Sequence, residues 1–580
     1  MKPQRECKIT SERLNKGREM SEFEKYSAER KALVERGDVP DWYTTQGYIM
    51  FKRKYSWQDE TVKEALYRVS SQLSNHVLDK YPEAQEKFYE LMWSGKLAPS
   101  TPVLCNVGTN RGQPVSCSGS YVGDSIDSFY TSYHEAAMLS QAGYGTSSYL
   151  SGIRSRGSKI ASGGEADGIV PVFDSFVDTV TKISQGNNRR GNWAGYVDMD
   201  SEDFWEMAGY LQKHPADANV GWVFTNDFIH KLQNKNREAV SRYSKVSYIR
   251  ARSGKGYIWK VDAANELAPI PIKQSGISIK ASNLCTEIAL PQDEEHTFSC
   301  VLSSLNLTHW DDFTYSDVFY SILFLDCVVE EMLAEARGKP GFEKIVRFTE
   351  KSRALGLGAL GFHSYLQSKM LPWESMEVYL LNGTIFKQIQ EWALAATRTL
   401  GLELGEPEWC KGTGQRNATV MAIAPNTSSA LLCGGVSQGI EPVVANAYNQ
   451  GTAAGEMTRM NPHFVQLCKD KGIFSLELMR DIAINHNGSV QHLEELSDLE
   501  KEVFKTAYEL NQFSLVRMAG ARQHFIDQAQ SLNLFFDTDE RYISEVIKEA
   551  LLNPYIKSLY YQRSLRGIKA SKGECEVCSG

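Results

Sequence analysis

Apolar residues recur at helical spacing near the start of the chain. Within 56–78 they lie three or four positions apart and would line one face of a helix: Val62, Leu66, Val69, Leu73 and Val77. Residues 1–95 as a whole are rich in charge and in helix formers. The pattern predicts a mainly helical N-terminal region over 1–95.

The residue pattern of the sequence changes at about residue 97. Short apolar or Thr/Ser-rich runs then alternate with Gly-rich turns and with helical stretches such as 167–183. Alternation of this kind is typical of an α/β body. The most apolar stretch, 318–333, is interrupted by Asp326 and two glutamates, so it predicts a buried helix rather than a membrane span.

Charge and cysteine usage narrow the range of partners. The 580 residues carry a net charge of −8 with both signs scattered, which favours neither nucleic acid nor a membrane surface. The polar N-terminus, MKPQRECKIT, has no apolar signal region, so we expect a cytoplasmic protein. Eleven cysteines without regular spacing do not form a secreted disulfide framework. Six of them are expected to be buried small hydrophobic residues: Cys7, Cys105, Cys327, Cys410, Cys433 and Cys468.

One segment, NLCTE, places a thiol between an amide and a carboxylate. If it is extended, Asn283, Cys285 and Glu287 share one face. The carboxylate could then act as a general base, while the amide could hold a substrate hydroxyl. Spacing alone favours a buried structural cysteine over a reactive one.

Two further segments could bind anions. In APNTSS the residues Asn426, Thr427, Ser428 and Ser429 would begin a helix, whose free N–H groups attract phosphate; a plain N-cap is the commoner interpretation. In the loop SQGNNRRGNWAG, Arg189 and Arg190 suit phosphate or base contacts, although a solvated turn fits equally well.

The C-terminal stretch pairs two aromatic residues with two thiols. Tyr560 and Tyr561 are adjacent, and such a pair usually serves packing. Beyond Arg566 the sequence has few large apolar residues, which predicts a mobile arm carrying Cys575 and Cys578. A lone C-x-x-C can be half of a zinc site, but no second C-x-x-C and no suitable histidine complete it.

Taken together and in order, four segments resemble the large, catalytic subunit of class I ribonucleotide reductase: 98–129, 276–307, 424–443 and the C-terminal stretch. The match runs from about residue 45 to the end. It implies a ten-stranded α/β barrel with a central finger loop, divided as 1–95 helical, 96–566 barrel and 567–580 redox tail. The activity implied is reduction of ribonucleoside diphosphates to deoxyribonucleotides for DNA replication.

The resemblance also assigns redox roles. Cys285 would carry a thiyl radical, flanked by Asn283 and Glu287 as substrate-binding and acid/base residues. Cys117 and Cys300 would become a disulfide as the substrate is reduced. Tyr560 and Tyr561 would carry the radical inward. Cys575 and Cys578 would carry the electron pair to the site.

Nucleotide contacts follow from the same comparison. Substrate binding is expected at Thr101, Ser116, Tyr144, Gly145, Pro425, Asn426, Thr427, Ser428 and Ser429. Deoxynucleotide or ATP effectors are expected at a dimer-interface specificity site, at Asp124, Ser125, Arg154, Arg189 and Arg190. A second basic residue of the specificity loop is replaced by Ala161-Ser162, so effector contacts should differ in detail.

The implied partners are a radical-generating small subunit with its metallocofactor, thioredoxin or glutaredoxin, and a second copy of the chain. No metal and no cofactor is expected on this chain itself. Only about 45 residues precede the matching region, which is too few for the N-terminal ATP-cone domain of large family members. Two alternatives remain: a class II, adenosylcobalamin-dependent reductase, which does not need the Tyr pair, and a nucleotide-binding paralogue without activity.

Overall fold

The N-terminal part of the chain is a group of helices. The computed structural model describes residues 22–161, 163–185, 189–190, 192–214, 219–452, 455–537 and 539–564. The first helical elements are α1 (Glu22–Arg36), α2 (Thr45–Met50), the π-helix η1 (Phe51–Tyr55), α3 (Val62–Ser74) and α4 (Ala84–Trp93). Thr61 caps α3 in a capping box, and all five apolar residues of the predicted stripe are buried. The helix expected within 56–78 is confirmed.

A seven-stranded sheet forms one side of the body. Its order is β15 (Ser558–Leu559), β8 (Tyr257–Lys260), β7 (Val220–Phe224), β6 (Trp193–Asp198), β3 (Gly145–Tyr149), β2 (Cys117–Tyr121) and β9 (Phe298–Cys300). The five inner strands are parallel and the two outer ones antiparallel. The helices between the parallel strands are α6 (Ile126–Gln141), α7 (Ile169–Thr181), α8 (Phe204–Lys213), α9 (Asn226–Gln233) and α10 (Arg237–Ser253). These are βαβ crossovers, and α7 lies within the stretch predicted to be helical.

A second, smaller sheet follows the first one along the chain. It joins β1 (Leu97–Pro99), β10 (Leu302–Asn306) and β11 (Gly356–Leu360), and parallel bridges extend it through Met421 and Ile423 to Gln530. Only Val301 separates β9 from β10, so the chain passes directly from one sheet to the other. The predicted α/β barrel is confirmed, with seven and three strands in its two sheets among the residues that the structure describes.

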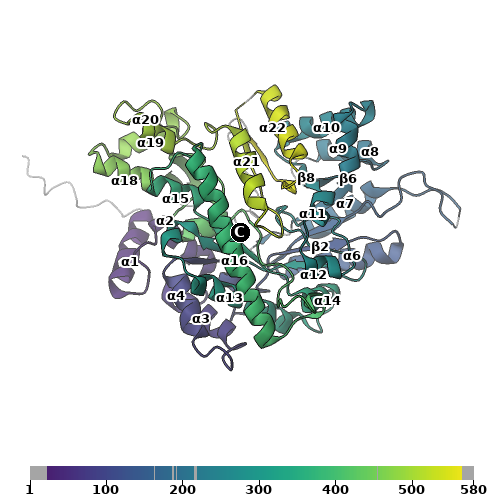
Figure 1. Cartoon of the computed structure of the whole chain (residues 1–580), viewed down its shortest axis with the longest axis horizontal. Coiled ribbons are helices and arrows are strands. Elements are labelled where there is room, and N and C mark those ends of the chain that lie inside the picture. Colours follow the sequence, from purple (N-terminus) through teal and green to yellow (C-terminus); the bar gives the residue numbers. More distant parts are fainter. Residues whose placement is uncertain are drawn as a thin grey trace, which may run out of the picture.

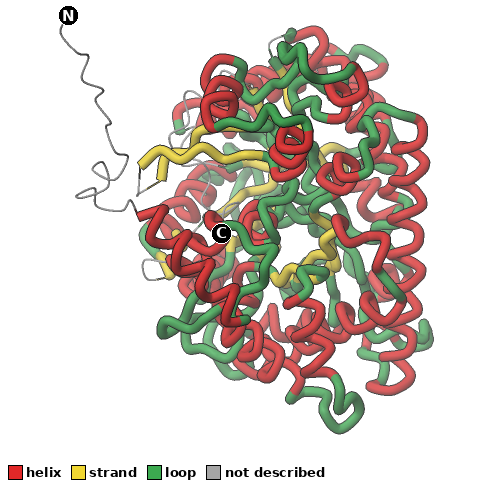
Figure 2. Tube along the Cα trace, turned by 90° about the vertical axis from the view of Figure 1, so that its left-hand side faces the viewer, coloured by secondary structure: helices red, strands yellow, loops and turns green. Residues whose placement is uncertain are grey.

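Helices surround the two sheets (Figure 1). The long helix α16 (Met376–Leu404) runs diagonally across the molecule, and the tube view shows a tall stack of helices along one side (Figure 2). The other elements around the barrel are α5 (Thr101–Asn106), β4 (Ser184–Gln185), β5 (Arg189–Arg190), α11 (Val261–Glu266), α12 (Ile270–Gln274), η2 (Leu307–Asp312), α13 (Tyr315–Ala336), α14 (Glu343–Ser352), α15 (Phe362–Ser368), η3 (Glu408–Cys410), α17 (Thr427–Leu432), α21 (Gln512–Gln523), β14 (Leu534–Phe536), α22 (Glu540–Leu552) and β16 (Gln562–Ser564).

A small helical lobe with its own apolar cluster stands beside the barrel, at the upper left of Figure 1. It contains the hairpin β12 (Ala447–Thr452) and β13 (Gly455–Met460), followed by α18 (Pro462–Asp470), α19 (Leu476–Asn485) and α20 (Asp498–Val503). Phe464, Met479, Ile482 and Val490 are among the fully buried residues of this cluster.

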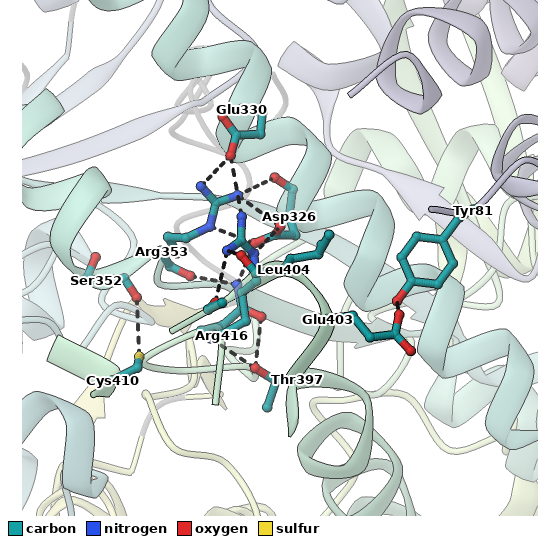
Figure 3. A network of polar contacts seen from close by, with 12 residues as sticks. Tyr81, Asp326, Glu330, Ser352, Arg353, Thr397, Glu403, Leu404, Cys410 and Arg416 are labelled. Atoms are coloured by element: carbon teal, nitrogen blue, oxygen red, sulfur yellow. Dashed lines mark hydrogen bonds and ion pairs between the residues drawn. The ribbon is translucent and has the colours of Figure 1, made fainter. Parts of the chain in front are cut away.

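The apolar stretch 318–333 forms most of α13, a helix buried along most of its length as predicted. Its Asp326 joins a charge network with Glu330, Arg353 and Arg416 (Figure 3). Asp326 accepts hydrogen bonds from both arginine Nε atoms at 2.9 Å, and from the Asn417 amide at the same distance. The network fixes α13 against the segments that lead into the second sheet.

Cysteine burial follows the prediction at five of the six positions. Cys105, Cys327, Cys410, Cys433 and Cys468 are buried, whereas Cys7 lies outside the described residues. Within the described part of the chain, helices that combine the length and the apolarity needed to cross a membrane do not occur.

Candidate active site

The finger segment carries the predicted reactive cysteine into the interior. Residues 281–292 are all buried and adopt neither helix nor strand. NLCTE is not extended, so the condition under which its three residues would share one strand face is not met. Thr286 has a φ of +66°, and its N–H donates to the Asn283 carbonyl at 3.3 Å. The backbone therefore turns within NLCTE instead of running straight through it.

The seven-stranded sheet holds one flank of this turn. The Tyr196 hydroxyl on β6 donates to the Asn283 carbonyl at 2.7 Å, and the Ser147 hydroxyl on β3 donates to the Ser282 carbonyl at 2.8 Å. The Asn283 side chain accepts from the Ile288 N–H at 3.3 Å, which closes the turn. Asn283 therefore shapes the finger with its own amide oxygen.

The segment 528–531 holds the other flank. The Ala529 N–H donates to the Glu287 carbonyl at 2.9 Å, and the Gln528 side chain accepts from the Ala289 N–H at 3.2 Å. The Ser531 hydroxyl lies 2.6 Å from the Cys285 carbonyl oxygen and 3.2 Å from Glu287 Oε2. The finger is thus fixed from both sides of the barrel, which places Cys285 rigidly.

Both tyrosines of the C-terminal stretch lie against this cysteine. The Tyr560 hydroxyl donates to Cys285 Sγ at 3.6 Å, and the ring centroids of Tyr560 and Tyr561 are 4.0 Å apart. Both side chains are buried. Tyr257 on β8 packs beside them, with its ring centroid 5.0 Å from that of Tyr560. The structure therefore brings Tyr561, Tyr560 and Cys285 together in one continuous row.

Among the described residues, no cationic side chain contributes to the pKa of Glu287. Burial raises its pKa to about 8, and the nearby Cys117 thiol adds to that effect. Only hydrogen-bond donors, such as the Ser531 hydroxyl, act in the opposite direction. A carboxyl whose pKa lies near neutrality can gain and lose a proton during a reaction, which is what acid/base work requires.

The other two cysteines of the predicted pair meet across a strand pair. Cys117 in β2 is the register partner of Cys300 in β9. Directly opposed residues of an antiparallel pair have Cα atoms about 4.5–5.5 Å apart, within the range that a disulfide spans. Cys117 is buried, and only the backbone of Cys300 is described.

The predicted helix start in APNTSS is confirmed. Helix α17 begins at Thr427, and Asn426 precedes it in the left-handed conformation with a φ of +55°. The Asn426 amide turns away from the helix and donates to the Ser304 hydroxyl on β10 at 2.8 Å, so it does not cap the first turn.

The remaining substrate candidates adjoin this helix and the first sheet. The Ser429 hydroxyl donates to the Pro99 carbonyl at 3.4 Å, which links α17 to β1 just before Thr101. The Thr101 hydroxyl is 2.8 Å from that of Tyr55. The Ser116 carbonyl accepts from the Gly145 N–H at 2.7 Å, next to the buried Tyr144. Pro425 lies one residue before Asn426.

Two effector candidates are in contact on the surface. Arg154 Nε donates to Asp124 Oδ2 at 2.6 Å, and its backbone N–H donates to Oδ1 at 3.2 Å. Ser125 is the N-cap of α6, where its hydroxyl accepts from the Ser128 N–H. Arg189 and Arg190 form β5, which pairs with β4, but their side chains lie outside the description, as do Ser162, Cys575 and Cys578.

Sequence reasoning missed Ser531, Gln528 and Tyr196, which position the finger. The segment around Ser531, DQAQSLN, is polar and resembles a surface loop. Its burial arises from pairing with residues more than a hundred positions away, which no local pattern records.

The barrel, its central finger and the buried cysteine define the class. The chain belongs to the ribonucleotide reductase family: residues 41–112 match the model of the all-alpha domain, and 115–238, 225–413 and 408–562 match that of the barrel domain. The resemblance to the family's large subunits is confirmed.

Individual relatives specify the comparison further. The chain is 31% identical to the ribonucleoside-diphosphate reductase large subunit of Invertebrate iridescent virus 3, over 92% of this chain and 98% of the relative. A solved structure, the class Id ribonucleotide reductase alpha subunit of Actinobacillus ureae, superposes with a TM-score of 0.83 at 33% identity, covering 93% and 99% of the two chains. A vitamin B12-dependent ribonucleoside-diphosphate reductase of Thermoplasma acidophilum is 28% identical over 78% of this chain and 61% of the relative.

Proposed function

We propose that this chain reduces ribonucleoside diphosphates to 2′-deoxyribonucleoside diphosphates, with a thiyl radical on Cys285 as the reactive group. The main support is the buried row of Tyr561, Tyr560 and Cys285. The two ring centroids are 4.0 Å apart, and the Tyr560 hydroxyl is 3.6 Å from Cys285 Sγ. Such a row suits the passage of one electron and one proton at a time. A separate small subunit, which holds the radical metallocofactor, supplies the radical through Tyr561.

The substrate steps follow from the residues around Cys285. The thiyl radical removes the 3′-hydrogen, and Glu287 takes the 3′-hydroxyl proton. The 2′-hydroxyl then leaves as water, protonated by the pair Cys117 and Cys300. These two thiols supply the two electrons that the product gains, and they end as a disulfide. Cys285 finally returns the hydrogen to C3′ and recovers the radical.

The disulfide must be reduced before the next turnover. Cys575 and Cys578 exchange with it and are themselves reduced by thioredoxin or glutaredoxin, in a reducing cytoplasm. Replacing both tail cysteines with serine should abolish turnover driven by thioredoxin and preserve turnover driven by dithiothreitol. An equal loss of turnover with both reductants would contradict the shuttle role of Cys575 and Cys578.

Nucleotides bind at two places in this proposal. The substrate phosphate lies at the start of α17, whose first-turn N–H groups Asn426 leaves uncapped, and the ribose lies near Thr101 and Ser116. A deoxynucleotide effector binds around Asp124 and Arg154 where two copies of the chain meet, and it selects the substrate.

The B12-dependent relative supports a second candidate, a class II reductase in which adenosylcobalamin supplies the radical. The direct Tyr560–Cys285 contact favours the first candidate, because a radical generated inside the site needs no tyrosine row. The test is a reduction assay on ribonucleoside diphosphates with the chain alone, with a candidate small subunit, and with adenosylcobalamin. We expect turnover only with the small subunit; turnover with adenosylcobalamin alone would establish the second candidate, and none in any arm would point to an inactive paralogue.

A further inference from the structure

Three potential metal ligands meet in the small lobe beside the barrel, at the end of α19 and in the loop that follows. Asp481, His486 and His492 each offer one ligand atom, and these atoms all lie within 4.8 Å of one another. Nothing in the reductase chemistry uses this lobe's histidines. We propose that the three side chains form a binding site for one zinc ion.

The distances fit a shared cation better than hydrogen bonds. Asp481 Oδ2 is 3.5 Å from His486 Nε2 and 3.7 Å from His492 Nε2. An N–H···O bond would be about 2.7–3.2 Å long. Ligands bound to zinc at about 2.0–2.1 Å in a tetrahedron are about 3.3–3.4 Å apart, which is close to the two distances from Asp481 to the histidines.

The two imidazole rings also lie in an unusual arrangement. Their centroids are 3.4 Å apart and the ring planes differ by 8°. Aromatic pairs generally prefer offset or edge-on contacts about 4.5–7 Å apart. On one tetrahedral ion the two rings would point away from each other, so zinc binding would open this stack.

The second oxygen of the carboxylate is already engaged. The Asn485 amide donates to Asp481 Oδ1 at 2.7 Å, which leaves Oδ2 facing both histidines. Groups of this kind orient carboxylate ligands in established metal sites, where their loss typically lowers affinity about 10- to 100-fold.

The loop between the histidines is anchored at several points. The Gly488 carbonyl accepts from the Asn446 N–H at 2.9 Å, the Gln491 amide donates to the Lys501 carbonyl at 2.9 Å, and Val490 is fully buried. Gly488 itself has a φ of +83°, and a Cβ there would lie 2.2 Å from that of Ala445. The ligands are therefore presented by a fixed backbone, with little ordering left to oppose binding.

Two histidines and one carboxylate suit zinc among the common divalent ions, whereas calcium and magnesium prefer oxygen ligands. The three side chains are 27–42% exposed, so water can complete the coordination. The bound ion would tie the end of α19 to the segment that leads into α20.

The test uses the full-length chain with Cys575 and Cys578 both replaced by serine, so that the tail thiols do not compete for zinc. Zinc chloride is titrated calorimetrically into protein freed of metal, and cobalt(II) is used as a spectroscopic substitute. We expect one equivalent of zinc to bind, a cobalt spectrum of nitrogen and oxygen ligands without thiolate charge-transfer bands, and a rise in Tm on zinc addition.

His492→Ala and Asp481→Asn should each weaken zinc binding at least tenfold. His230→Ala, which removes an exposed histidine on α9, should leave it unchanged. Metal-free Tm values of the variants show whether the lobe stays folded, and the milder Asp481→Asn keeps the test valid if His492→Ala does not. Zinc affinity that is equal in all four proteins, or a thiolate cobalt spectrum, would overturn the proposal.

Discussion

The interior of this reductase buries carboxylates in two contrasting surroundings, at Asp326 and at Glu287. Asp326 lies between two guanidinium groups. Burial alone would raise its pKa, but Arg353 and Arg416 lower it to about 2. Glu287 lies among uncharged groups, and burial raises its pKa to about 8. The two side chains are equally inaccessible, so their neighbours alone decide the direction of the shift.

The contrast separates a structural charge from a chemical one. Asp326, Glu330, Arg353 and Arg416 form a set in which two carboxylates face two guanidinium groups. The Ser531 hydroxyl lies 3.2 Å from the Glu287 carboxyl, and a neutral donor of this kind orients the carboxyl without fixing its charge. A catalytic acid/base group needs that freedom.

The largest effect should come from Tyr561→Phe, which tests whether turnover requires oxidation of this tyrosine. Phenylalanine fills the same space but cannot lose a hydroxyl hydrogen, so turnover with the small subunit should fall to background. Nucleotide binding, measured by calorimetry, should be unchanged. Tyr257→Phe is the matched control, because its hydroxyl bonds to Asn219 and its ring lies beside the row. Normal turnover in Tyr561→Phe would refute the class I assignment.

The next largest effect should be on stability, from Asp326→Asn. Removing one charge from a buried network leaves its partners uncompensated, which typically costs about 3–5 kcal/mol. Denaturant unfolding should show that loss, while turnover per folded molecule should change little. Glu330→Gln alters the same network at a side chain that is 30% exposed, so about 1 kcal/mol or less is expected. An equal loss of unfolding free energy in the two variants would show that burial of the charge does not matter here.

Local sequence patterns predicted part of the charge network at Asp326. The site around Cys285 was predicted only from the resemblance to a known family. Asp326 interrupts an apolar helix, so the sequence already indicates a buried charge that needs a cation. Its partners lie 27 and 90 residues away and depend on the tertiary fold. The Tyr560–Cys285 contact spans 275 residues, and only the joint occurrence of family motifs predicted it.

Two features of the finger were beyond sequence reasoning for a physical reason. The backbone turns at Thr286 instead of continuing as an extended strand, and no residue type in NLCTE requires a positive φ. Ser531 acts through its position, and a serine has the same local pattern whether it is buried or exposed. The helices at 62–74 and 315–336 were predictable, since their periodicity or length is local information.

A moderate effect is expected from Ser531→Ala, which removes a hydroxyl that lies beside Glu287. The change leaves the Cys285 carbonyl without this donor and takes a hydrogen bond from Glu287, a loss of about 1–3 kcal/mol. We expect turnover to fall about 5- to 100-fold and the pKa of Glu287 to rise further. Ser558→Ala removes a similar buried hydroxyl, which bonds to Gln530, and should leave the pH profile unmoved. Identical profiles in both variants would assign Ser531 to packing alone.

The most direct measure of the contrast is the pH dependence of the two carboxylates. As the base, Glu287 must be ionised, so kcat/KM should rise about tenfold per pH unit below 8 and level off above it. Because the folded-state pKa exceeds the unfolded value of about 4.3, the stability due to Glu287 falls as pH rises between the two values. Glu287→Gln should lack that decline and be inactive. Asp326 has the opposite sign: its contribution is complete above the unfolded pKa and is lost as pH falls toward 2. A kcat/KM profile that is flat from pH 6 to 9 would show that a different group accepts the proton, and the two buried carboxylates would then differ in stability only.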